Sequence, residues 1–130
     1  MLRLIYILGG FLSLISGVWM LFFPFSWYSD FPAAIPDTGP FNSHLIRDLG
    51  VAYLCIALAF VWCAGRPKGS RQIHLGLTVF FTGHAIIHLF EIFSGRMPRY
   101  HWMVDTPLVF LPAIILIVLS LPRVRERIGG

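Results

Sequence analysis

The sequence has few charged residues. Asp, Glu, Lys and Arg make up only 12% of its 130 residues, whereas soluble domains carry about 25%. Hydrophobic residues account for 57% and the mean hydropathy is +0.77. These values exclude an ordinary soluble domain of this length and indicate a membrane protein.

Cysteine is also scarce. The two cysteines, Cys55 and Cys63, fall within one apolar stretch. Their number and spacing indicate neither a disulfide framework nor a close-spaced thiolate pair. We therefore expect both to pack as small hydrophobic residues.

Long polar segments are missing, and this leaves no room for a second domain. Four apolar stretches lie at about 4–25, 43–64, 72–94 and 103–122, each near the ~20 residues that a membrane span needs. In lipid, backbone polar groups must be satisfied within each span. We predict an all-α integral membrane four-helix bundle, a single domain over residues 1–130. The first stretch is too long for a signal peptide and no small-residue cleavage site follows it.

The first connection, from about 24 to 41, is rich in proline and aromatic residues. The prolines prevent a long helix, and Trp and Tyr favour the headgroup level. We predict an aromatic, Pro-rich interfacial loop between helices 1 and 2, which either anchors the protein or covers a site. Asn42 or Ser43 can cap the helix that follows, and Ser43 is the better placed.

The net charge of +4 does not indicate nucleic-acid binding, because the basic residues lie at helix ends. The second connection, 66–71, and the segment after the last span are basic, whereas the first connection carries only Asp30 and Asp37. The positive-inside rule then places both termini in the cytoplasm. Arg96 and Arg99 in the third connection oppose this orientation but are outnumbered.

Several ionisable residues interrupt the apolar stretches. His84, His88 and Glu91 share one helical stripe, which must face protein because an ionisable group at membrane depth costs about 3 kcal/mol. At about 1.5 Å of rise per residue, spans of alternating direction place six such residues in one layer of the outer half: His44, Arg47, Asp48, His88, Glu91 and Asp105. The candidate polar site comprises this layer and His84.

One obligate cation, Arg47, faces three acids in this layer. The excess negative charge needs protonated carboxyls, imidazolium or a bound cation. Imidazole and carboxylate suit zinc, iron or manganese. The candidate ligands of such a divalent ion are His44, Asp48, His84, His88 and Glu91.

Two other interpretations remain open at this stage. As an enzyme, the protein would use His88 or Glu91 as general base, Arg47 as electrostatic anchor and Asp105 as orienting acid. As a non-catalytic accessory subunit, it would use the same charges as register-fixing salt bridges, with Arg47 paired to Glu91 or Asp105. A haem between His84 and a neighbouring histidine has no support beyond the histidines themselves.

The segment Gly39–Gly50, GPFNSHLIRDLG, together with the Pro-rich first connection and the His/Glu stripe, resembles the small bacterial four-helix DoxX-like proteins. That family takes its name from a subunit associated with thiosulfate and quinone oxidation, so the resemblance implies service to a membrane oxidoreductase. More distantly, the layout is similar to sterol isomerases and sterol-binding proteins, whose catalytic residues do not align with this chain.

The combined expectation is a multi-pass bacterial inner-membrane protein. Its polar site would bind a metal ion or a small lipophilic ligand. Its partners would be the lipid bilayer and either a membrane protein or a second copy of the chain. The sequence does not decide whether the protein is an enzyme.

Overall fold

The computed structural model describes residues 1–128 of the chain. Four helical segments are long and apolar enough to cross a membrane: α1 (Leu2–Phe22), α3 (Ser43–Gly65), α4 (Arg71–Phe93) and a fourth span over His101–Ser120. This confirms the all-α membrane bundle. Predicted and observed helix ends differ by at most three residues, as at the end of the first span, 25 against 22.

The first connection is more ordered than an irregular loop. It contains the short helix α2 (Pro24–Asp30), which begins with proline in the position where its missing N–H costs nothing, and the 3₁₀ turn η1 (Ile35–Thr38). The prediction that Ser43 caps the next helix is wrong. The cap is Asn42, whose side-chain oxygen accepts a hydrogen bond from the Leu45 backbone N–H at 3.1 Å.

The fourth span is interrupted near its middle. It consists of α5 (His101–Asp105), the π-helical turn η2 (Thr106–Phe110) and α6 (Leu111–Ser120), with α7 (Pro122–Ile128) after it. The Leu111 N–H donates to the Thr106 carbonyl, five residues back. Because Pro112 has no N–H, the regular ladder cannot continue through it, and the wide turn lies directly before that proline.

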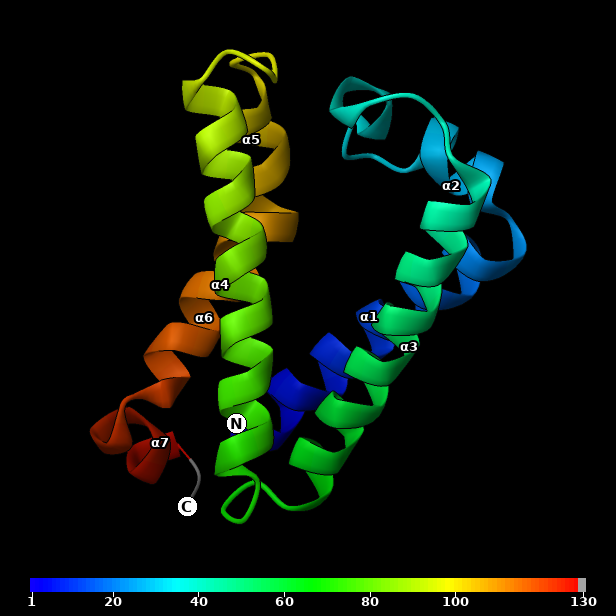
Figure 1. The fold of residues 1–130 in the computed structure, drawn as a ribbon. Helices are drawn as coiled ribbons and strands as arrows, with labels where there is room; N and C mark the ends of the chain where they lie inside the picture. Colours follow the sequence, from blue (N-terminus) through cyan, green and yellow to red (C-terminus); the bar gives the residue numbers. More distant parts are fainter. Residues whose placement is uncertain (129–130) are drawn as a thin grey trace.

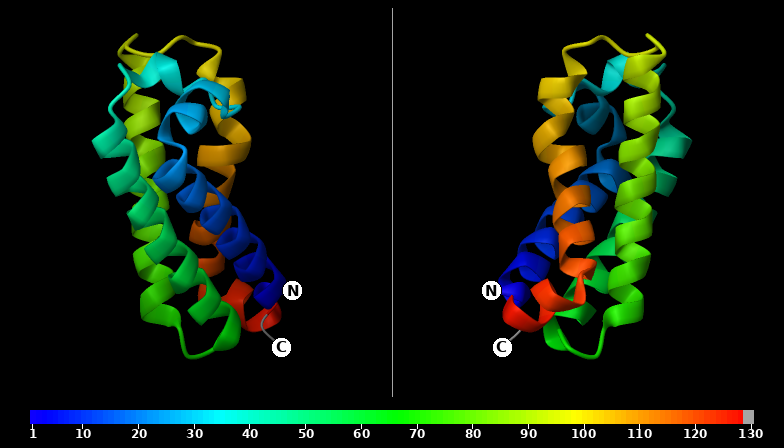
Figure 2. Two further views of the ribbon diagram at one scale, coloured as in Figure 1. Left: turned by 90° about the vertical axis from the view of Figure 1, so that its right-hand side faces the viewer. Right: turned by 90° about the vertical axis from the view of Figure 1, so that its left-hand side faces the viewer.

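The helices form two pairs, α1 with α3 and α4 with the fourth span (Figure 1). Close packing of the first pair depends on glycine: a Cβ at Gly50 would lie 3.0 Å from the Gly17 carbonyl oxygen and 2.9 Å from the Leu21 nitrogen. Small residues at a helix crossing allow this backbone approach in membranes. The start of α1 and the helix α7 lie at one end of the bundle, here called the terminal end, opposite the distal end that carries η1 and residues 94–100 (Figure 2).

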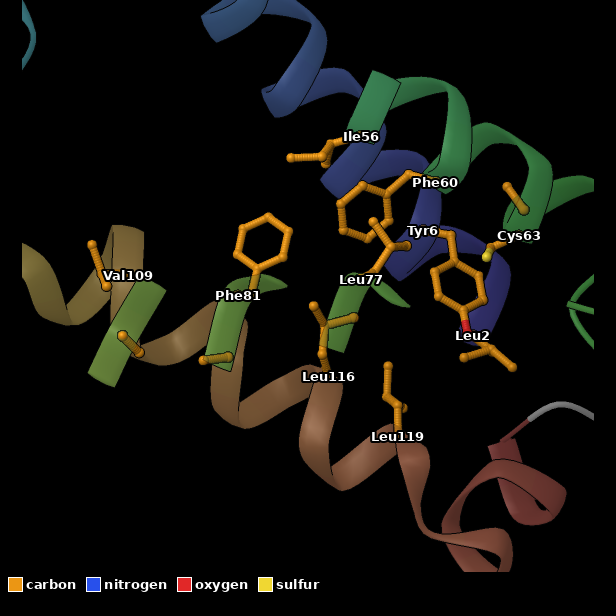
Figure 3. Close-up of a cluster of buried hydrophobic side chains, with 13 residues drawn as sticks. Leu2, Tyr6, Ile56, Phe60, Cys63, Leu77, Phe81, Val109, Leu116 and Leu119 are labelled. Atoms are coloured by element: carbon orange, nitrogen blue, oxygen red, sulfur yellow. The ribbon is translucent and has the colours of Figure 1, made fainter. Parts of the chain in front are cut away.

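A hydrophobic cluster joins the two pairs at the terminal end. Phe60 from α3, Leu77 and Phe81 from α4, and Leu116 and Leu119 from α6 all belong to it (Figure 3). The pairs diverge from this cluster toward the distal end (Figure 1). The contact at one end leaves the distal half open for a site.

Candidate functional site

A cavity of about 760 Å³ lies between the two helix pairs. Most of its wall is apolar and aromatic, including Trp19 on α1, Trp27 and Tyr28 on α2, and Phe81 on α4. Its size falls within the ~300–1,000 Å³ of small-molecule sites, which combine apolar walls with a few polar groups. The histidines and acids that line this cavity belong to α4 and to the fourth span.

Four of the predicted site residues line this cavity: His84, His88, Glu91 and Asp105. Nδ1 of His88 lies within hydrogen-bond distance of Oδ2 of Asp105, at 2.8 Å, and the rings of His84 and His88 meet edge to face with centroids 4.6 Å apart. The predicted stripe of α4 therefore faces protein. The position of His88 along α4 places its ring against Asp105 of the fourth span.

Asp105 is fully buried and has a second partner. Nδ1 of His101 lies 3.3 Å from each carboxylate oxygen of Asp105. The other ring nitrogen of His101, Nε2, lies 3.2 Å from Oδ2 of Asp37 in η1, and Asp37 also accepts a hydrogen bond from the Tyr100 hydroxyl. A continuous row of polar side chains thus extends from the distal surface to the cavity.

Asp37, Tyr100 and His101 together form the distal contact. Two pKa values are shifted in this contact. Hydrogen bonds from Tyr100 and His101 lower the pKa of Asp37 below its ordinary value. The same carboxylate raises the pKa of the Tyr100 hydroxyl, which donates to it. Both shifts favour the state in which the carboxylate is charged and the phenol is neutral.

The structure does not bring His44, Arg47 and Asp48 to the cavity. The side chains of His44 and Asp48 are 89% and 65% exposed and pair with each other, at 3.3 Å. Arg47 donates to the Leu21 carbonyl and to Ser43. The apolar residues Leu45, Ile46 and Leu49 of α3 line the cavity. The rotation of α3 about its own axis therefore turns its polar face away from the cavity.

The predicted metal site lacks this second pair of ligands. His44 and Asp48 lie outside the cavity, which leaves His84, His88 and Glu91 on α4 alone. Within residues 1–128, no three His, Cys, Asp or Glu side chains are placed to hold one metal ion. The arrangement therefore gives no support to a zinc, iron or manganese centre.

Comparison of the chain with protein-family models, curated proteins and solved structures gives no match. The likeness to DoxX-like proteins stays a prediction.

Sequence reasoning missed two residues of this row, His101 and Asp37. His101 precedes Asp105 by four positions, a spacing that places both on one helical face. The sequence therefore contained a signal for the His101–Asp105 contact. The partner Asp37 was not predictable, because it lies 64 positions away in a connection whose path depends on the folded bundle.

His74 is fully buried. Nδ1 of its ring lies 3.0 Å from the Tyr6 hydroxyl, and Nε2 lies 3.1 Å from Oγ of Ser120. Arg125 donates to the same tyrosine oxygen. This second polar cluster ties four helices together at the terminal end, away from the cavity.

Proposed function

We propose that this chain is a bacterial inner-membrane protein, with both termini in the cytoplasm, that binds a lipophilic small molecule carrying a hydrogen-bonding group. The body of the ligand occupies the apolar part of the cavity. Its polar group meets the histidines of α4. Because the sequence resembles DoxX-like proteins, we further propose that the protein serves a membrane oxidoreductase.

A nitrogen atom without a partner in the cavity wall carries the proposal. His88 lines the cavity, and Nδ1 of its ring lies 2.8 Å from Oδ2 of Asp105, whereas no hydrogen-bond partner of Nε2 is found among the described residues. Buried polar side-chain atoms in native proteins mostly have a partner, and the His88 side chain is only 14% exposed. A polar ligand atom beside His88 would supply the missing bond.

The apolar rim of the cavity supports a ligand that comes from the bilayer. Leu12 on α1 and Leu45 on α3 line the cavity and are 62% and 64% exposed on the surface of their helices. Both residues lie in segments that cross the membrane. A ligand dissolved in lipid would therefore reach the cavity without passing through water.

Binding can be tested in lipid nanodiscs with a brominated long-chain ketone as the probe ligand. In a variant that retains Trp27 and carries Phe at the other three tryptophan positions, bromine quenches Trp27 fluorescence on contact. We expect saturable quenching whose affinity falls roughly fivefold in His88→Phe, since one hydrogen bond contributes about 1 kcal/mol. The control His44→Phe changes a histidine outside the cavity. Non-saturable quenching in the parent would contradict the proposal.

The row of hydrogen bonds also supports a second candidate, a non-catalytic accessory subunit. The His88–Asp105 bond fixes α4 against the fourth span, as a register device would. In that case the lipid-facing surface would contact a membrane protein partner or a second copy. Purification at native expression levels separates the two candidates, because a monodisperse protein that binds the ketone fits only the first.

A further inference from the structure

Exposure is lowest in the middle of the row of side chains that leads from the distal surface to the cavity. The side chain of Asp37 is 32% exposed, whereas those of His101 and Asp105 are 0% and 1% exposed. His88, 14% exposed, lines the cavity. The buried middle of the row thus connects one end in contact with water to another end in contact with the cavity.

Every member of this row can both accept and release a proton. His101 lies between two carboxyl groups, with a different ring nitrogen toward each. A neutral imidazole accepts a proton on one nitrogen and releases the proton held by the other. His101 can therefore pass a proton from one carboxyl group to the other along its two hydrogen bonds.

The free end of the row is Nε2 of His88. Nδ1 of this ring is committed to Asp105, and among residues 1–128 no hydrogen-bond partner of Nε2 is found. The neighbouring ring of His84 and the carboxyl group of Glu91 line the same cavity. A ligand with an acidic or basic atom would meet Nε2 of His88.

We propose that Asp37, His101, Asp105 and His88 form a proton path through which a group bound in the cavity exchanges protons with water at the distal surface. The proposal rests on the proposed function in naming a ligand as the final acceptor. The path itself ends at His88 whether or not a ligand is bound.

The inward step is a sequence of balanced proton transfers. Asp37 takes a proton from water and passes it to Nε2 of His101, and the proton on Nδ1 of His101 moves to Asp105. Asp105 then protonates Nδ1 of His88, which releases the proton on Nε2 to the cavity. Each ring ends in the opposite tautomer, so return of a proton by the same route resets the path. The device therefore exchanges protons and does not pump them.

The experiment follows His88 in the ligand-free protein, in lipid nanodiscs, by NMR of ¹⁵N-labelled histidine rings. Proton exchange between the His88 ring and water is measured in the parent, in His101→Phe and in His101→Gln. Gln keeps a hydrogen-bonding side chain between the two acids but does not shuttle protons as imidazole does. His44→Gln is the matched control, and His74, buried at the terminal end, is the internal reference.

We expect exchange at His88 to slow by roughly 10²-fold in both His101 variants, the lower range of what a positioned acid or base contributes to proton transfer. Exchange in His44→Gln and at His74 should not change. If the Phe variant does not fold, the Gln variant decides alone. Unchanged exchange at His88 in folded His101→Gln would overturn the proton path. Failure to bind the brominated ketone would overturn the proposed function and leave this measurement intact.

Discussion

Nδ1 of His88 lies 2.8 Å from Oδ2 of Asp105, across a helix-to-helix contact in which the acid is 1% exposed. The pair joins α4 to the fourth span at the wall of the cavity. The chain also contains an exposed pair of the same chemical type, His44 with Asp48. The two pairs allow the effect of burial to be measured within one protein.

Asp105→Ala should destabilise the protein by roughly 1–3 kcal/mol, because His88 and His101 both lose their buried acceptor. Asp48→Ala is the control, and removal of such an exposed pair should cost under about 1 kcal/mol. The free energy of unfolding in mild detergent measures both. Equal losses in the two variants would show that the buried bond contributes no more than the exposed one.

Gly50→Ala should weaken the α1–α3 contact by roughly 1–3 kcal/mol, since the added methyl group meets backbone atoms that cannot move aside. Its Cβ would lie 2.9 Å from the Leu21 nitrogen. Gly83→Ala provides the control: a Cβ there meets nothing within 4 Å, and the helix should gain about 0.5–1 kcal/mol. Thermal unfolding of the two variants should therefore shift in opposite directions.

The distal contact should depend on pH. Because hydrogen bonds from Tyr100 and His101 lower the pKa of Asp37, their stabilisation is present above the ordinary Asp pKa of about 3.9 and is lost as the pH falls through the lowered value. Amide hydrogen exchange of η1, corrected for the intrinsic pH effect, should rise in that acidic range.

Asp37→Asn should abolish the acid-dependent rise in exchange. Asp30→Asn is the matched control, because the pKa of Asp30 is also lowered, but by Ser29 and Ser26 of its own helix. A rise that persists in Asp37→Asn would assign the acid sensitivity to another group.

Leu45→Trp should slow association of the brominated ketone several-fold, because Leu45 lines the cavity and is 64% exposed at its membrane-facing rim. Leu58 lies on the same helix, is 70% exposed and does not line the cavity. Stopped-flow quenching should show no effect of Leu58→Trp. Equal association rates for the parent and Leu45→Trp would argue against access from the bilayer at this rim.

Tyr6→Phe should cost roughly 1–3 kcal/mol, since it leaves the fully buried His74 without its Nδ1 partner. Tyr53→Phe removes a hydroxyl for which no hydrogen bond is found among the described residues, and its effect should be near zero. Chemical unfolding of both variants in detergent provides the comparison. A neutral Tyr6→Phe would mean that water replaces the lost hydroxyl.

Hydropathy made the four spans and their boundaries predictable, because an apolar run of spanning length has few alternatives to a membrane helix. The inward face of α4 was predictable for a related reason: three ionisable residues on one stripe must avoid lipid. For α3 the same reasoning gave a wrong prediction of which face lies toward the cavity. Its polar residues His44, Arg47 and Asp48 lie near the end of the span, where an exposed face is tolerated and the sequence does not determine the rotation of the helix.

The prediction that the polar residues of α3 share a face with those of α4 was therefore wrong. Depth follows from position along one helix. A shared face depends on how two helices rotate about their own axes, which the packing of Gly17 against Gly50 decides. The contact between Asp37 and His101 depends in addition on the path of the first connection.

The two helix pairs meet in a packed cluster at the terminal end, and at the distal end few polar contacts join them. A change in the angle between the two pairs would disrupt these distal contacts and leave the packed cluster in place. The protein should bind ligands of several widths by changing this angle. Its selectivity would then come from hydrogen bonding at the α4 histidines and from lateral pressure in the surrounding lipid, and only weakly from the shape of the ligand.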